Sequence, residues 1–177
     1  MKHLLHVKQN QFHFVNFHPK VWVIKETNPD TRESQIKVVV LSRNLTCSND
    51  LDVVCELIGK IRSKTATKKA RIKHGPLSDF LLWLSNRCDR KSRKNIKSII
   101  DNIEYIERFE LYDSPFEDYD FFPMGIEGYD GIEQCLNGAI LDHAAEIIVI
   151  SPFVDNTTLT SMTANAPKAK KTLITRH

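Results

Sequence analysis

The first third of the chain alternates apolar runs with polar breaks in a pattern that predicts three β-strands. The first run, Phe12 to Lys25, is rich in phenylalanine, valine and tryptophan, and a polar stretch with a turn at Asn28 follows it. The second, Ile36 to Leu41, contains three consecutive valines, as expected of a strand covered on both faces. The third is Leu51 to Ile58. Such close succession predicts an antiparallel meander.

The middle of the chain has a different, helical periodicity. The basic stretch Arg62 to His74 lacks apolar periodicity and predicts an exposed loop. Pro76 is expected to open a short helix that runs to Cys88, since proline suits the first turn of a helix. A second helix is predicted by the cleanest apolar stripe, which consists of Ile96, Ile99, Ile100, Ile103 and Ile106. This stripe indicates core packing and carries no chemistry.

The last third predicts shorter elements. A strand is expected at 109–112, an acidic and aromatic connection at 113–131, a helix at about 132–145 and a buried strand at 147–150. Asp155 is expected to cap a helix at 157–165, and a final strand is expected at 172–175. The whole pattern predicts a mixed α/β (α+β) domain.

Composition excludes several classes of protein. Hydrophobic residues make up 41% and charged residues 27% of 177 positions, which excludes a wholly disordered or fibrous chain. No apolar run approaches the roughly 20 residues that span a bilayer, and the first ten residues do not resemble a signal peptide. The four cysteines are scattered without a C-x-x-C pair, which indicates reduced thiols in a cytoplasmic protein and neither disulfides nor a zinc site: Cys47, Cys55, Cys88 and Cys135.

Charge is strongly segregated although the net charge is only +3. Residues 60–97 contain 13 lysines and arginines and two acids, whereas residues 98–155 contain 14 acids and one arginine. The basic segment could bind nucleic acid, or the two segments could be solvated faces that attract each other. Charge segregation by itself favours the solvated faces. The basic segment also has few aromatic residues that could stack on bases, since Phe80 and Trp83 are expected to be packing residues of the predicted helix.

The residues best suited to chemistry flank the first two predicted strands. His18 and Lys20 are two positions apart at a strand start and therefore share a face. Ser42, Arg43 and Asn44 follow the next strand, at an edge where an antiparallel neighbour brings them close to Lys20. A histidine can attack phosphorus, while lysine and asparagine hold the phosphoryl oxygens, and this chemistry needs no metal or other cofactor. Arg43 is expected to contact phosphate or to form a surface salt bridge.

These motifs resemble the phospholipase D superfamily, and most closely its bacterial members with "FHPK" followed by "SRNLT". The resemblance implies a phosphohistidine mechanism with His18 as nucleophile or general acid and with Lys20 and Asn44 as phosphate ligands. It makes Ser42 a supporting donor. A carboxylate is expected to orient the histidine: Asp52 in the first instance, with Glu56 as the alternative.

A second resemblance lies near the other end, where residues 146–154 and 172–176 look like the opening of a second repeat of that family. The chain would then comprise the later half of one repeat (1–112), a linker (113–131) and the first part of another (132–177), an incomplete two-repeat architecture. The H-x-K expected later in the chain, for the second repeat, is absent, because no suitably placed lysine follows His74, His143 or His177. Leu41 also replaces the usual glycine before Ser42. A complete site would need a homodimer or a missing second half. The alternative is a non-catalytic module that binds phosphate or nucleic acid, or that is a structural remnant.

Overall fold

The computed structural model describes residues 19–43, 52–62, 67–129, 141 and 143–175. Contacts divide the chain into two compact units, Met1–Phe121 and Phe122–His177. Each unit combines a small β-sheet with one or more helices, so the fold is mixed α+β. The two units are described separately below.

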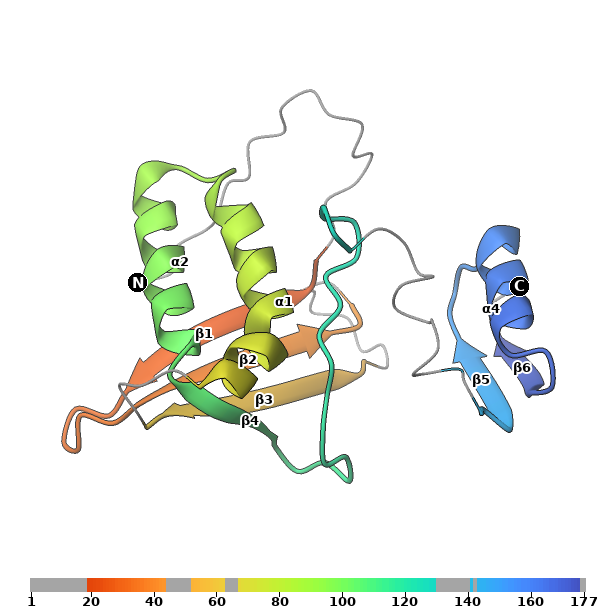
Figure 1. The fold of residues 1–177 in the computed structure, drawn as a ribbon, viewed down its shortest axis with the longest axis horizontal. Coiled ribbons are helices and arrows are strands. Elements are labelled where there is room, and N and C mark those ends of the chain that lie inside the picture. The colour runs from red at the N-terminus through yellow and green to blue at the C-terminus, as the bar shows by residue number, and fades with distance from the viewer. Residues whose placement is uncertain (1–18, 44–51, 63–66, 130–140, 142, 176–177) are drawn as a thin grey trace. The chain divides into compact units, whose positions relative to one another are not determined.

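The first unit is built on a four-stranded antiparallel sheet in the order β1-β2-β3-β4 (Figure 1). The strands are β1 (Val21–Thr27), β2 (Ser34–Leu41), β3 (Val54–Ile61) and β4 (Ile106–Leu111). The predicted meander is therefore confirmed, with β3 shifted toward the C-terminus of the expected range. The part of the first predicted strand before residue 19 lies outside the described residues.

The turn predicted at Asn28 is confirmed and joins β1 to β2. The Asn28 side-chain oxygen accepts hydrogen bonds from the backbone N–H groups of Asp30, at 2.8 Å, and Thr31, at 3.1 Å. Such a short-range side-chain bond replaces the backbone pairing that a tight turn gives up. It also fixes the register, in which Val23 pairs with Val38.

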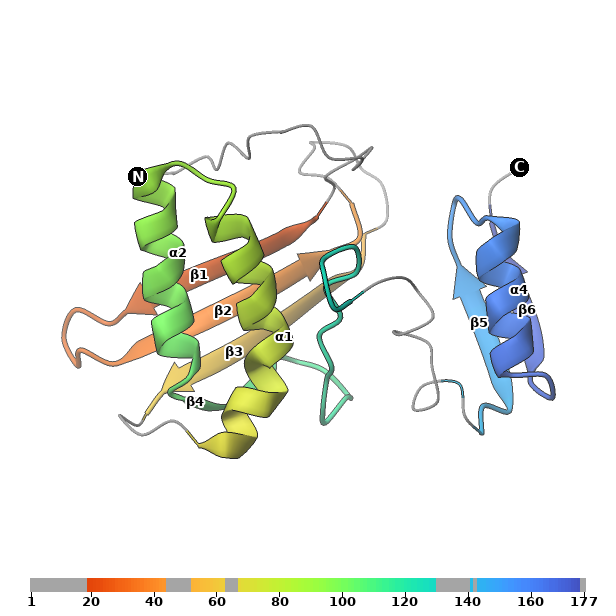
Figure 2. The same cartoon turned by 45° about the horizontal axis from the view of Figure 1, so that its top comes forward.

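Two helices, α1 (Lys68–Ser85) and α2 (Arg90–Ile103), lie on the same face of this sheet (Figure 2). The buried core lies between helices and sheet, and its largest fully buried apolar side chains are Phe109, Ile36, Ile103, Ile106 and Val38. Burial along β2 alternates, with Ile36 and Val38 buried and Val39 half-buried. The expectation that this strand is covered on both faces is therefore wrong, because the helices cover one face.

The prediction of a loop over Arg62 to His74 is also wrong for the second half of that range. The α1 helix begins at Lys68, where the Thr67 side chain accepts a hydrogen bond from the Ala70 N–H at 3.1 Å. Pro76 lies inside the helix and does not open it. Proline removes one helical hydrogen bond. The buried side of α1 nevertheless continues across Pro76, from His74 to Leu77, and the packing of that side outweighs the free energy lost with the hydrogen bond.

The second unit contains a strand, a helix and a parallel strand: β5 (Glu146–Ile150), α4 (Asn156–Asn165) and β6 (Lys170–Ile174). Asp155 caps α4 by accepting from the Thr158 N–H at 2.9 Å, as predicted. The expected burial of β5 is wrong for alternate residues, since Ile148 and Ile150 are 59% and 76% exposed. The helix predicted at 132–145 falls mainly outside the described residues.

Candidate functional site

One end of the four-stranded sheet gathers four of the six predicted site residues. Lys20 precedes β1, Ser42 and Arg43 follow β2, and Asp52 lies two residues before β3. The Leu41 N–H donates to the Lys20 carbonyl at 2.8 Å, and the Ser42 N–H donates to the Val53 carbonyl at 3.0 Å. The antiparallel ladder thus brings three chain segments to one edge. His18 and Asn44 lie outside the described residues.

Ser42 holds the carboxylate of Asp52 through two donors. Its backbone N–H lies 3.1 Å from Oδ1 of Asp52, and its hydroxyl donates to the same oxygen. The Val53 N–H in turn donates to the Ser42 hydroxyl oxygen at 3.0 Å, which orients the hydroxyl proton toward Asp52. Asp52 is therefore fixed in position by its neighbour across the strand pair.

The same contacts favour the ionised form of Asp52. The hydrogen bond from the Ser42 hydroxyl lowers the pKa of the Asp52 carboxyl, and the Val53 and Ser42 backbone amides and the Arg43 charge lower it further. Donors that bind a carboxylate stabilise its charged state. The group is thus a preorganised anion, suited to orienting a cationic or proton-bearing partner.

Glu56, the alternative carboxylate, lies elsewhere on the sheet. It pairs with Val39 in the β2–β3 register, and its carboxylate lies 3.9 Å from the ammonium nitrogen of Lys37. Lys37 also contacts Glu26 at 3.4 Å. Glu56 therefore belongs to a charged row across the strands, whereas Asp52 lies beside Ser42.

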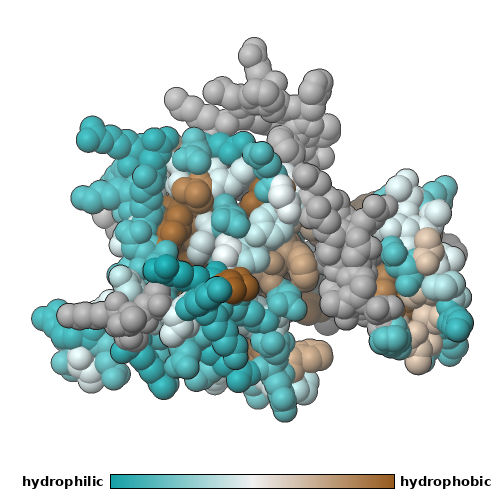
Figure 3. All heavy atoms as spheres, in the orientation of Figure 1, coloured by the Kyte–Doolittle hydropathy of each residue, from teal (hydrophilic) through white to brown (hydrophobic). Residues whose placement is uncertain are grey.

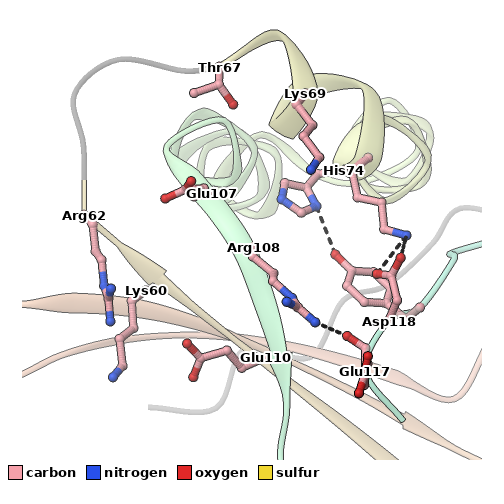
Figure 4. Close-up of a pocket in the computed structure, with 12 residues that line it drawn as sticks. Lys60, Arg62, Thr67, Lys69, His74, Glu107, Arg108, Glu110, Glu117 and Asp118 are labelled. Atoms are coloured by element: carbon pink, nitrogen blue, oxygen red, sulfur yellow. Dashed lines mark hydrogen bonds and ion pairs between the residues drawn. The ribbon is translucent and has the colours of Figure 1, made fainter.

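A separate pocket of about 680 Å³ opens between the end of β3, the start of α1, β4 and the segment after β4 (Figure 4). Its deepest group is His74, which is 3% exposed. Nε2 of His74 lies 3.1 Å from the Ile106 carbonyl, and Nδ1 lies 3.0 Å from the Tyr119 hydroxyl. Since a carbonyl only accepts, Nε2 carries the proton and Tyr119 donates to Nδ1.

His74 is not among the predicted site residues, because the residues before Pro76 are predicted to form a loop. The usable signal was the spacing of Ala70, His74 and Leu77, which continues the apolar stripe of the later helix toward the N-terminus. Burial lowers the pKa of His74, so the ring stays neutral at physiological pH.

Charges of both signs line the mouth of this pocket. Lys73 lies 3.0 Å from Asp118 and 2.9 Å from Asp120. Burial lowers the pKa of Lys73, but the hydrogen bonds and negative charges of these two carboxylates together outweigh burial and raise the pKa. The remaining charged residues of the lining include four bases and three acids: Lys60, Arg62, Lys69, Arg108, Glu107, Glu110 and Glu117. Such a mixed lining does not select an anion or a cation. The pocket also lies at the opposite end of β3 from Asp52.

Comparison with known proteins finds no match among protein-family models, curated proteins or solved structures. Within the part of the chain that the structure describes, no helix has the length and apolar character needed to cross a membrane. The geometry at the Ser42 end of the sheet therefore carries the functional argument.

Proposed function

We propose that this chain is a metal-independent phosphodiesterase of the phospholipase D type that acts on nucleic acid rather than on lipid. The observation that supports this proposal is the grouping of Lys20, Ser42 and Asp52 at one sheet end, with Asp52 held ionised by Ser42. His18 is two residues from Lys20 in the sequence, and Asn44 is two residues from Ser42. The basic segment 60–97 favours a nucleic-acid substrate.

In the proposed reaction, an imidazole nitrogen of His18 attacks phosphorus and the bond to the leaving alcohol oxygen breaks. A general acid gives that oxygen its proton. Water then attacks the phosphohistidine, which releases a phosphomonoester and restores the histidine. Lys20 and Asn44 stabilise the negative charge on the non-bridging oxygens, and Asp52 orients His18.

The proposed reaction needs a second histidine as general acid, and none of the histidines after His18 begins an H-x-K that a second repeat would place in the site. In a homodimer, a second copy would supply His18 as the acid. In a longer protein, a further segment would supply it. The lack of an H-x-K after His18 also favours a second candidate function, a non-catalytic module that binds phosphate or nucleic acid.

The test is hydrolysis of bis-p-nitrophenyl phosphate in the presence of EDTA. We expect turnover that EDTA leaves unchanged and that His18→Ala abolishes. His143→Ala is the matched control, because this exposed histidine belongs to the second unit. A homodimeric site further predicts that specific activity rises with protein concentration.

Two results would contradict the proposed catalysis by His18. Equal turnover in wild type and His18→Ala would mean that His18 is not the nucleophile. Absence of turnover would favour the non-catalytic module if added phosphate also stabilised the protein against unfolding and Lys20→Ala removed that stabilisation.

A further inference from the structure

The α2 helix has two sharply different faces. Ser92, Ile96 and Ile103 are buried toward the core. The opposite side carries Arg90, Lys94 and Lys97, all exposed and spaced at i, i+4 and i+7, so that they form one line along the helix. We call these three residues the cationic stripe. The outer side of α2 is hydrophilic in the orientation of Figure 3.

Local electrostatics disfavours this arrangement in the isolated protein. The N-terminus of a helix carries the positive end of its dipole, and the first turn of α2 has no acidic side chain. The carboxylate of Asp89 is engaged in capping, since it accepts from the N–H groups of Lys91, at 2.8 Å, and Ser92, at 3.1 Å.

No ion pair found among the described residues includes a member of the cationic stripe. Two cations of α1 differ in this respect, since Arg71 pairs with Glu104 at 3.3 Å and Lys73 pairs with Asp118 and Asp120. The charge of the stripe is therefore available to an external anion.

Two arginines beside the stripe are held in place by the protein. The Arg87 guanidinium lies 3.8 Å from the centre of the Trp83 ring and donates to the Trp83 carbonyl at 3.2 Å. Nε of Arg93 donates to the Ser85 carbonyl at 2.9 Å. These contacts fix two further positive charges near the α1–α2 turn and reduce the side-chain entropy that binding would cost.

We propose that the cationic stripe, flanked by Arg87, Lys91 and Arg93, binds the phosphate backbone of nucleic acid without reading its sequence. From Arg90 to Lys97 the helix rises about 10 Å, which is comparable to about three phosphates at the 3.4 Å rise of one strand. The apolar side of α2 packs on the core, so this helix has no free apolar face to insert into a lipid surface. Binding at the stripe does not depend on the phosphodiesterase proposed above.

The test measures fluorescence anisotropy of labelled oligonucleotides, single-stranded and duplex, of about 16 nucleotides or base pairs. His18→Ala protein is used throughout, so that hydrolysis cannot consume the probe. The stripe variant combines Arg90→Gln, Lys94→Gln and Lys97→Gln. The matched control combines Lys25→Gln, Arg32→Gln and Lys168→Gln, three exposed positions outside the α2 helix with the same change in net charge.

We expect the stripe variant to weaken binding at least about tenfold and to reduce the salt slope by about two to three, since each phosphate contact on a duplex contributes about 0.9. The control should change affinity by less than about threefold. Equal weakening by both variants would overturn the proposal, because net charge would then suffice. Absence of oligonucleotide binding would overturn it as well.

A membrane role is tested with vesicles that contain phosphatidylserine. Stripe-dependent sedimentation with these vesicles, without stripe-dependent oligonucleotide binding, would overturn the proposal in favour of an anionic lipid surface. Stripe-dependent oligonucleotide binding by a protein whose wild type hydrolyses no phosphodiester would support this inference while contradicting the proposed enzyme.

Discussion

The hydroxyl of Tyr119 lies 3.0 Å from Nδ1 of His74, a residue 45 positions earlier in the chain. This hydrogen bond joins the segment after β4 to the buried side of α1. Phe109 completes the cluster, with its ring centre 5.1 Å from that of His74 and 6.2 Å from that of Tyr119, edge-on to both. The hydrogen bond from the Tyr119 hydroxyl therefore attaches the acidic segment after β4 to the core.

The first prediction follows from this bond. Tyr119→Phe keeps the ring but leaves a buried imidazole nitrogen without its donor, which should lower the free energy of unfolding by about 1–3 kcal/mol. Urea unfolding monitored by circular dichroism measures the change. Tyr112→Phe is the matched control at a 67% exposed position, and it should change stability by less than about 0.5 kcal/mol. Equal effects of the two variants would contradict a structural role for the bond.

His74 should also make stability depend on pH. Burial lowers its pKa in the folded protein below the ordinary value of 6.5. Between those two values the unfolded chain binds the proton and the folded chain does not, so the free energy of unfolding should fall as pH decreases below about 6.5. Urea unfolding at several pH values from about 7.5 to about 5.5 should show a steeper fall in wild type than in His74→Gln. Parallel profiles would show that another group titrates instead.

The Ser42–Asp52 contact predicts a shift in one carboxyl titration. Ser42→Ala removes the hydroxyl that most strongly lowers the pKa of Asp52, so this pKa should move up toward its ordinary value. Carbon-detected NMR of side-chain carboxyl groups can follow the titration. The pKa of Asp155, which accepts from Thr158 in the second unit, should stay unchanged. An unchanged Asp52 titration would mean that the hydroxyl does not bind the carboxylate in solution.

Gly59 is required by close packing within the sheet. A Cβ added there would lie 2.7 Å from Cγ2 of Ile106 and 2.7 Å from two ring carbons of Phe109. Gly59→Ala should therefore lower the free energy of unfolding by about 1–3 kcal/mol, as other overpacked cores do. Chemical unfolding gives the measurement, and Lys60→Ala, at an exposed neighbour, serves as the control. Wild-type stability of Gly59→Ala would show that β4 moves away at no cost.

Acidic substitutions in the first turn of α2 should have opposite effects on stability and on oligonucleotide binding. Replacing Arg90 and Lys91 by glutamate places negative charge at the positive end of the helix dipole, which should stabilise the protein by about 0.3–1 kcal/mol per substitution. The same variant should bind oligonucleotides more weakly. Thermal unfolding and anisotropy measured on one preparation test both effects. Lower stability in this variant would indicate that the basic side chains support the fold.

Much of the secondary structure was predictable because short-range interactions specify it. The valine-rich run of β2, the Asn28 turn and the Asp155 cap each depend on residues within a few positions of one another. The predicted start of α1 was wrong because the first half of this helix packs against a strand that is distant in the sequence. In the sequence His74 belongs to a basic stretch that predicts a loop. In the structure it is buried, and its ring forms a hydrogen bond with the carbonyl of Ile106 in β4, 32 residues later.

The candidate site divides in the same way. The sequence by itself determined the residue types and their order: the H-x-K at His18 and Lys20, the turn from Ser42 to Asn44 and the later Asp52. It left Asp52 and Glu56 as alternatives, because both carboxylates are near the start of the same strand. Only the tertiary structure placed Asp52 beside Ser42 and Glu56 beside Lys37. The register between β2 and β3 sets these two positions, and register depends on pairing between strands, which a local pattern does not specify.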